Sequence, residues 1–345
     1  MIEVKNLSKK YGDFEAVRDV SFSLGRDQVL GFLGPNGAGK TTVMKILTGY
    51  HFPSGGQAIV DGISVEESPV EVKKRIGYLP ESNPLYGDMT ADEYLYFAAS
   101  ARLLPKEKIR KAVDDAIAAC GLEGERSHRI ESLSKGYKQR VGLAQAIIHD
   151  PPILILDEPT SGLDPNQIIE IRSLITELGK RKTVILSTHI LQEVEAVCSQ
   201  VLILNEGRIA AQGTPDEIAK TIRTGGGMDT WELFLKGAGA AEIESRLGQL
   251  ERETGEIKAE ALDDGIVRLG FVMKNSGTYA LDGECIFDWA IKQGYKIIGM
   301  NRKKLSLEDI FVKLTSEGRS GEPLTAEGSQ PLTSEERKIN TGAES

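Results

Sequence analysis

One stretch of nine residues restricts the fold of this chain more than any other: GPNGAGKTT, from Gly34 to Thr42. An apolar strand candidate at 28–33 precedes it, and a helix candidate at 41–47 follows it. The pattern Gly-x4-Gly-Lys-Thr between a strand and a helix is the Walker A phosphate loop. Its glycines let consecutive backbone N–H groups turn inward, and the following helix adds its positive N-terminal end. The sequence therefore predicts a binding site for a polyphosphate at the end of a buried strand.

Every residue of this loop is a candidate contact to a bound nucleoside triphosphate. The candidates are Gly34, Pro35, Asn36, Gly37, Ala38, Gly39, Lys40, Thr41 and Thr42. Lys40 is expected to bridge the β- and γ-phosphates, and Thr41 to offer its hydroxyl to Mg²⁺. The alternative is a plain glycine turn beside a solvated lysine. The motif alone predicts binding of a nucleoside triphosphate and does not separate kinases, GTPases and motor ATPases.

A second motif, ILILDEPT at 153–160, places four apolar residues before Asp157 and Glu158. A buried strand that delivers two acids at its carboxyl end needs a cation or a proton to offset their charge. Asp157 fits the Walker B carboxylate, which holds Mg²⁺ through water. Glu158 fits the catalytic group that polarises the attacking water. Two acids at the start of a loop are common, so this prediction depends on their pairing with the phosphate loop.

Apolar segments of strand length recur along the chain, with helical patterns between them. We expect strands within 2–24 and at 28–33, 76–79, 153–156, 184–186 and 201–204. Fully apolar strands of this kind are typical of a parallel sheet that is buried on both faces. Helical patterns dominate from about 90 to 150, where Thr90 and Glu93 form a capping box. The sequence predicts an α/β fold with a helical insertion between 85 and 150.

With these motifs in order, the first 220 residues or so resemble the ATPases of ABC transporters. LSKGYKQR at 133–140 resembles the signature motif of that family, and SGLDP at 161–165 resembles its D-loop. STH, which ends at His189, resembles its switch histidine. The resemblance implies a P-loop NTPase fold, with a RecA-like core, an antiparallel β edge and a helical subdomain. It also implies ATP hydrolysis with Mg²⁺.

The resemblance implies further contacts to the nucleotide. Ser134 and the backbone N–H of Gly136 would form a second anion site that closes over the γ-phosphate held by another subunit. Two chains would thus enclose two ATP molecules head to tail, with Asp164 linking the two sites. His189 would hydrogen-bond the γ-phosphate and orient water, and Tyr11 would stack on adenine. The alternatives are a structural histidine at a strand end and an ordinary exposed or core tyrosine.

Two departures from the family pattern are visible. The signature usually has Gly before Gly136 and Gln after it, whereas this chain has Lys135 and Tyr137. The phosphate-facing pair, Ser134 and Gly136, is kept. The family's Q-loop glutamine is replaced by Glu81, which can approach Mg²⁺ through water but adds negative charge beside a triphosphate. Both departures resemble the exporter branch of the family, whose ATPases pair with separate membrane subunits.

The sequence predicts two domains. The ATPase domain is expected at 1–222, with its helical subdomain at about 85–150, and a linker at 223–227 follows. Residues 228–316 predict a small α+β domain in the order β-α-β-β-α-β, which suggests a ferredoxin-like fold. Its last helix would be capped by Ser306 with Asp309, and we expect dimer contacts or regulation from it rather than chemistry. The tail at 317–345 lacks aromatic residues and is expected to be disordered.

Composition excludes several function classes. The formal net charge of −9 argues against broad binding to nucleic acid, because neutralising phosphates takes clustered Lys and Arg. Cys120, Cys198 and Cys285 are widely spaced and odd in number, so reduced thiols are expected. No secretion signal and no apolar run of the roughly 18 residues needed for a membrane span is visible. We therefore expect a cytoplasmic protein that is peripheral on the inner face of the cell membrane.

The leading hypothesis is an ATP-hydrolysing subunit of an ABC export complex, as a homodimer or heterodimer of ATPase subunits with a separately encoded membrane subunit. The run at 303–315 resembles the ending of drug, polysaccharide and gliding-motility ATPases of that branch. The segment 82–89 is expected to meet a helix of the membrane subunit. The alternatives are a soluble ABC-type ATPase that acts on ribosomes or DNA, and a non-hydrolysing nucleotide sensor. The transported substrate does not follow from the sequence.

Overall fold

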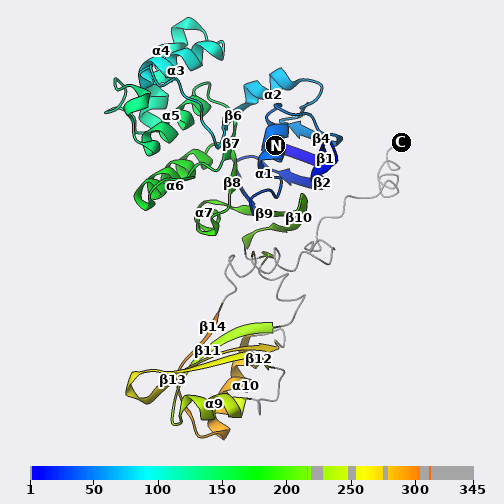
Figure 1. Ribbon diagram of the computed structural model, residues 1–345, viewed down its shortest axis with the longest axis vertical. Coiled ribbons are helices and arrows are strands. Elements are labelled where there is room, and N and C mark those ends of the chain that lie inside the picture. Colours follow the sequence, from blue (N-terminus) through cyan, green and yellow to red (C-terminus); the bar gives the residue numbers. More distant parts are fainter. Residues whose placement is uncertain are drawn as a thin grey trace, which may run out of the picture.

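The computed structural model describes residues 2–215, 217–218, 228–247, 254–274, 279–303 and 311. A six-stranded sheet is the centre of the N-terminal part (Figure 1). Its strands, in spatial order, are β10 (Arg208–Gly213), β9 (Gln200–Asn205), β3 (Val29–Leu33), β8 (Thr183–Thr188), β7 (Ile153–Asp157) and β6 (Ile76–Leu79). Neighbouring strands are parallel, except that β10 is antiparallel to β9. Every residue of β3, β7 and β8 is buried, which confirms the predicted parallel sheet covered on both faces.

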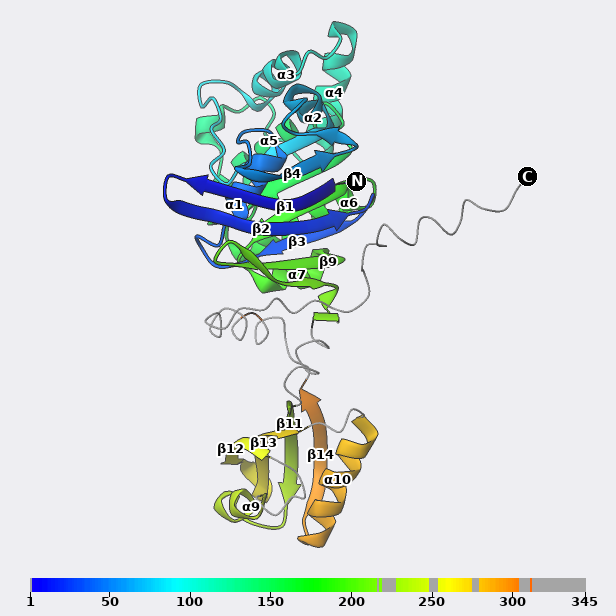
Figure 2. The same cartoon turned by 90° about the vertical axis from the view of Figure 1, so that its right-hand side faces the viewer.

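A second, antiparallel sheet packs over the first. Its spatial order is β2 (Phe14–Leu24), β1 (Ile2–Tyr11), β4 (Gly55–Val60) and β5 (Ile63–Ser64). Figure 2 shows the long strands β1 and β2 side by side, next to β4. Helix α1 (Lys40–Leu47) joins the two sheets, because its apolar side chains share one buried cluster with residues of both. This burial fixes the helix that begins directly at the phosphate loop.

Three helices gather at one end of the N-terminal part, away from β1 and β2 (Figure 1). They are α3 (Ala91–Ala101), α4 (Lys106–Ala119) and α5 (Lys135–Ile147). The predicted capping box is present at the start of α3: Thr90 N–H donates to Glu93 at 2.9 Å, and Glu93 N–H donates to Thr90 at 3.2 Å. The other helices are α2 (Pro69–Arg75), α6 (Pro165–Gly179) and α7 (Leu191–Val197). No helix within the described residues is long and apolar enough to cross a membrane.

The described residues between 228 and 303 form a third sheet, in which all neighbouring strands are antiparallel. Its spatial order is β12 (Thr254–Ala261), β13 (Ile266–Lys274), β11 (Met228–Lys236) and β14 (Lys296–Lys303). Helices α9 (Ala240–Leu247) and α10 (Tyr279–Lys292) share one buried cluster with this sheet. The element order is β-α-β-β-α-β, as predicted. Trp231 and Trp289 are both buried in the cluster.

Some predicted features lie outside the described residues. These are the linker at 223–227, the tail at 317–345 and the cap of the last helix at Ser306 and Asp309. Phe311 is described, and it packs against the apolar cluster that contains Val194 and Ile203.

The three cysteines are free, as predicted. Burial raises the pKa of the Cys120 thiol and of the Cys198 thiol to about 12. Both thiols therefore stay protonated at neutral pH and behave as small apolar side chains.

Gly77 joins the helical region to the central sheet. It lies in β6, where a Cβ atom would come within 2.1 Å of the Ala146 carbonyl oxygen of α5. The contact partner is backbone, which cannot rotate away as a side chain can. This close approach matters to the site, because Glu81 follows β6 and Ser134 precedes α5.

We predict that Gly77→Ala lowers the free energy of unfolding by about 1–3 kcal/mol, because the methyl group forces β6 and α5 apart. Gly124→Ala is the matched control, since a Cβ there meets no atom within 4 Å. Urea unfolding of the full chain measures both. Equal midpoints for the two variants would contradict the close packing of β6 on α5.

Candidate functional site

Most of the predicted site residues line one open pocket of about 480 Å³ at one edge of the central sheet. The lining residues are Tyr11, Phe14, Ala16, Pro35, Asn36, Gly37, Ala38, Gly39, Lys40, Thr41, Thr42, Glu81, Glu158, Ser161 and His189. The segments that carry them follow β3, β6, β7 and β8, or join β1 to β2. Because parallel strands end at the same edge of a sheet, residues distant in sequence meet there.

Lys40 is the buried cation of the pocket. Its Nζ donates to the carbonyl oxygen of Gly34 at 2.7 Å, and it lies 3.5 Å from Glu158 Oε1. Lys40 is 7% exposed and the Glu158 side chain 8%. Two opposite charges removed from water in this way offset part of each other's desolvation cost. A strong anion that enters the pocket would compete with Glu158 for the ammonium group.

Asp157 carries a carboxylate oxygen with no hydrogen-bond partner among the described residues. Its Oδ1 accepts a hydrogen bond from Ser187 and lies 3.4 Å from Thr41 Oγ1, whereas its Oδ2 is buried without a partner. A buried carboxylate oxygen without a partner is costly unless a cation or a donor reaches it. Hydroxyl and carboxylate oxygens are ligands that Mg²⁺ prefers, so this pair fits the metal of a nucleotide complex.

Glu158 and His189 contact each other directly, although they follow different strands. His189 Nδ1 lies 2.8 Å from Glu158 Oε2. The Glu158 side chain is buried, while that of His189 is 51% exposed and reaches toward the pocket opening. The backbone of Glu158 has φ 49°, in the left-handed region that a non-glycine residue rarely adopts. The Glu158 N–H donates to the Ser187 carbonyl oxygen at 3.0 Å and to the Ser187 hydroxyl oxygen at 3.1 Å, and these two hydrogen bonds hold it there.

Two aromatic side chains form the outer wall of the pocket. Tyr11 and Phe14 are opposite each other across the β1–β2 turn, and both are largely exposed. Lys9 Nζ lies 5.3 Å from the centre of the Tyr11 ring. Tyr11 was predicted as a site residue and Phe14 was not, although an aromatic residue three positions further in the same hairpin was a usable signal. An exposed pair of rings offers a stacking surface to a planar base.

Ser134, Gly136 and Asp164 do not line this pocket. Ser134 is the N-cap of α5 and accepts the Tyr137 N–H at 3.3 Å, and Asp164 is the N-cap of α6 and accepts the Gln167 N–H at 2.9 Å. A Cβ at Gly136 would come within 2.7 Å of the Gln167 side chain, so the starts of α5 and α6 lie against each other. Within one chain, the structure therefore separates these predicted contacts from the phosphate loop.

Glu81 lines the pocket from the segment after β6, on an exposed side chain. Among the hydrogen bonds and ion pairs of the described residues, none joins Glu81 to Thr41 or Asp157. Ser187 was missed as a site residue, although the STH motif contains it. Within the described residues, no group of three or more His, Cys, Asp or Glu side chains could hold a metal by itself.

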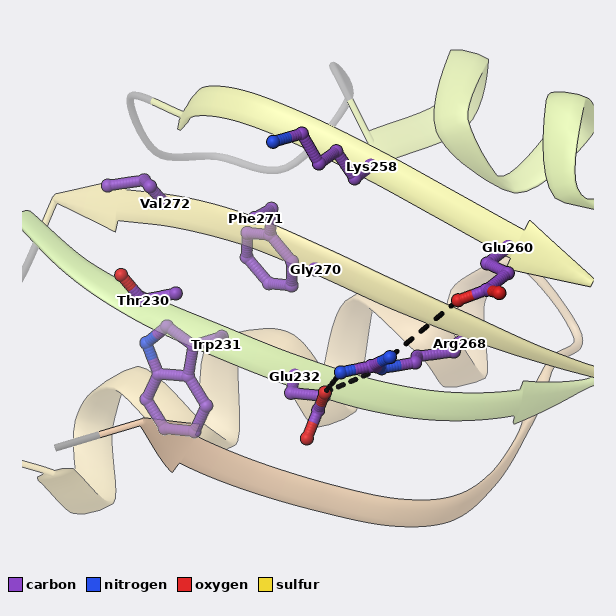
Figure 3. A pocket seen from close by; sticks show the side chains of 9 residues that line it. All are labelled: Thr230, Trp231, Glu232, Lys258, Glu260, Arg268, Gly270, Phe271 and Val272. Carbon is purple, nitrogen blue, oxygen red and sulfur yellow. Dashed lines mark hydrogen bonds and ion pairs between the residues drawn. The ribbon is translucent and has the colours of Figure 1, made fainter. Parts of the chain in front are cut away.

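A separate hollow of about 330 Å³ lies on the third sheet (Figure 3). The charged groups that line it largely pair with one another. Arg268 contacts Glu232 Oε1 at 2.6 Å and Glu260 Oε2 at 3.6 Å. Gly270 leaves the hollow open, and opposite charges balance around it. It offers no unbalanced charge that would select a ligand, so the pocket at the phosphate loop is the candidate site.

Comparison with known proteins agrees with this geometry. Residues 17–161 match the family described as ABC transporter. The chain is 34% identical over 318 residues to an uncharacterized ABC transporter ATP-binding protein, YxlF of Bacillus subtilis, covering 91% of this chain and 99% of that protein. It is 32% identical over 323 residues to the bacitracin transport ATP-binding protein BcrA of Bacillus licheniformis, covering 93% and 99%.

A solved structure with this fold is the dimer of the ATP-binding cassette MJ0796 bound to ADP and Pi. It matches with a TM-score of 0.57 and 25% identity, over 62% of this chain and 98% of that one. The confirmed fold is therefore a P-loop NTPase cassette with mixed α/β sheets. With relatives matched over nearly their whole length and a pocket built from the expected motifs, this chain belongs to the family of ABC transporter ATP-binding proteins.

Proposed function

We propose that this ATPase hydrolyses ATP in the pocket at the phosphate loop and couples the hydrolysis to export by a separate membrane subunit. The observation that carries the proposal is the meeting of the phosphate loop, Glu158 and His189 in one pocket. Relatives of similar length include BcrA, a bacitracin transport protein, and the Nod factor export ATP-binding protein I of Burkholderia orbicola. Their names support export, and they do not identify the cargo of this chain.

In the proposed complex, the triphosphate lies on the inward-turned amides between Gly34 and Thr42. Lys40 leaves Glu158 and holds the β- and γ-phosphates, because a triphosphate carries more charge than one carboxylate. The adenine stacks on Tyr11, and Phe14 extends the same surface. Thr41 and Asp157 would hold Mg²⁺, with Glu81 as a further contact through water, and bound Mg²⁺ would supply positive charge that offsets the charge of the phosphates.

Glu158, freed from Lys40, would accept a proton from the attacking water. The buried carboxylate of Glu158 lies beside His189. Once Lys40 has moved to the phosphates, His189 would hydrogen-bond the γ-phosphate. Held between the histidine and the water, the carboxylate has one orientation for proton transfer.

The second half of the site is proposed to come from another copy of this or a similar ATPase chain. Ser134 is the N-cap of α5 and Gly136 lies in its first turn, where free backbone N–H groups favour an anion, and neither residue lines its own chain's pocket. The dimeric structures of MJ0796 support a closed dimer as the working form. Asp164, at the adjacent start of α6, is proposed to link the two sites.

The proposed domain division is an ATPase domain at 1–222, a linker at 223–227, an accessory domain at 228–316 and a tail at 317–345. The strand order of the accessory domain, β12-β13-β11-β14, and its two helices on a shared core support a ferredoxin-like fold. Its charged groups pair internally, so we assign it packing or regulation rather than catalysis.

The membrane subunit is proposed to dock beside the segment 82–89, which places the ATPase on the cytoplasmic face of the membrane. Leu85 and Met89 are partly buried and pack against the core of α3, α4 and α5. Tyr86 is 51% exposed. We propose that the docking surface extends from Tyr86 into the pocket beside it.

That neighbouring pocket has a volume of about 330 Å³ and lies between α2, β6 and α3. Three tyrosines, Tyr50, Tyr78 and Tyr94, and two cations, Lys73 and Arg102, are among its lining residues. Burial and the charge of Asp157 raise the pKa of Tyr78, so its phenol adds no negative charge. No acidic side chain is among the described residues that line it. A helix of the membrane subunit with an acidic side chain would complement it.

Ribosome-bound or DNA-bound action is not favoured. The relatives matched over nearly their whole length are transporter ATP-binding proteins, and the net charge of −9 opposes broad contact with nucleic acid.

The first prediction concerns Glu158. Glu158→Gln keeps the shape of the side chain and removes its basicity, so the turnover number should fall at least about 100-fold while ATP still binds. Phosphate release and size-exclusion chromatography with Mg-ATP measure turnover and dimer accumulation. Glu66→Gln, at an exposed acid away from the pocket, is the control. Turnover within threefold of wild type would remove Glu158 from the proton-accepting role.

The second prediction concerns the shared site. Lys40→Ala removes the phosphate-loop cation, Ser134→Arg blocks the second anion site, and each variant alone should be inactive. Mixing them should restore about a quarter of wild-type ATPase activity, because half of the dimers are mixed and each of these holds one intact site. No recovery on mixing, with mixed dimers verified by two affinity tags, would contradict completion of the site by a second chain.

The third prediction concerns docking. A photo-crosslinking residue at Tyr86 or Tyr50 should label the membrane subunit in the purified complex, because both side chains are exposed beside the docking pocket. Ile169, exposed on α6, is the control position and should not label it. Products that join only ATPase chains would place the membrane subunit elsewhere.

A further inference from the structure

Glu193 is a buried acid that none of the motifs above accounts for. It lies in the first turn of α7, five residues after Thr188, and it is 1% exposed. It does not line the pocket at the phosphate loop. An ionised carboxylate in such a position has lost its water and requires compensating donors.

The two oxygens of Glu193 accept hydrogen bonds from two different segments, the turn after β7 and the end of β8. Thr160 Oγ1 donates to Glu193 Oε1, and Thr188 Oγ1 donates to Glu193 Oε2 at 2.8 Å. Both hydroxyls are buried. Thr160 lies two residues after Glu158, and Thr188 lies directly before His189. One carboxylate thus links, by hydrogen bonds, the two segments that carry Glu158 and His189.

Further contacts make this arrangement specific to a carboxylate. Thr188 Oγ1 also accepts the Ile190 N–H at 3.0 Å, so its own proton is directed to Glu193. Arg172 Nη2 of α6 lies 4.0 Å from Glu193 Oε1 and supplies a positive charge. A carboxylate has two acceptor oxygens and no donor, which matches two hydroxyl donors and a guanidinium group.

The backbone of Glu158 explains why such a tie is needed. Its φ of 49° is a conformation that persists when surrounding contacts hold it. Ser187 holds the Glu158 N–H on one side, and the Thr160–Glu193–Thr188 contacts hold the loop that follows. Release of that loop would change the 2.8 Å contact between His189 and Glu158.

We propose that Glu193 is a positioning residue for ATP hydrolysis, which fixes Glu158 and His189 relative to each other through Thr160 and Thr188. The inference rests on the proposed function of the pocket. Glu193 is not proposed to affect the affinity for nucleotide, because among the described residues neither Lys40 nor the loop at 34–42 makes a hydrogen bond to the Glu193 carboxylate.

Glu193→Gln is the decisive variant. The amide keeps the volume of the side chain but replaces one acceptor oxygen by a donor. Only one of the two threonine hydroxyls can then donate to residue 193, and Arg172 loses its counter-charge. The turnover number for ATP should fall about 10- to 100-fold, as expected for a misplaced reacting group. The KM for ATP and the binding of a non-hydrolysable ATP analogue should change less than about threefold.

Two sets of controls separate positioning from stability. Glu195→Gln changes an exposed acid on the same helix and should leave turnover unchanged. Thr160→Ser and Thr188→Ser keep the hydroxyl donors and should retain turnover, whereas Thr160→Val and Thr188→Val should lower it. Glu193→Gln combined with Thr160→Val should be no slower than the slower single variant, because both remove the same contact.

The experiment uses the full chain, with steady-state turnover, analogue binding and thermal unfolding measured on each variant. A wild-type protein that does not hydrolyse ATP would overturn the proposed function itself. A wild-type protein that hydrolyses ATP while Glu193→Gln turns over within threefold of it would overturn the positioning role alone. Glu193 would be a structural residue if turnover, analogue binding and thermal stability fell equally, in the Ser variants as well as in the Val variants. That result would also overturn the positioning role.

Discussion

The site depends on the contact between Lys40 and Glu158, two buried opposite charges that are 3.5 Å apart at the carboxyl ends of the parallel strands. Neither charge would be stable there alone, because each has lost its water. The lysine begins the helix that packs between two sheets, and the glutamate follows the buried strand β7. The fold therefore brings together a cation suited to binding phosphate and an acid suited to activating water. In this structure each of the two charged groups is the ion-pair partner of the other.

This arrangement suggests how binding and hydrolysis are linked. A triphosphate that draws Lys40 away leaves Glu158 without its nearest cation and with His189 as its neighbour. The carboxylate would then become available as a base only when the phosphates are in place. A second chain would take part as well: Ser134 and Gly136 do not line their own chain's pocket, so an isolated protomer would bind nucleotide without completing the site.

Much of this could be predicted from the sequence, because the relevant signals are local. The apolar strands at 28–33 and 153–156, the glycine spacing around Lys40 and the capping box at Thr90 are each contained in a few residues, and the structure has them as predicted. Two of the antiparallel strands were harder to predict. β4, with the sequence GGQAIV, and β10, with RIAAQG, have weak alternation, since their pairing partners rather than their own composition place them in a sheet.

Phe14 and Ser187 lie close in sequence to Tyr11 and His189, so local signals for them were present. Glu193 is different, because it acts through contacts that the chain makes only once it is folded; Thr160 and Glu193 are 33 residues apart when their side chains meet. A sequence pattern shows neither that separation nor the burial of the acid. The most direct measurement of the central claim is a structure of the full-length Glu158→Gln variant with Mg-ATP. The account predicts a triphosphate on Lys40 of one chain, with Ser134 of the partner chain within hydrogen-bond distance of the γ-phosphate. Nucleotide bound away from the phosphate loop, or contacted by one chain alone in a closed dimer, would contradict it.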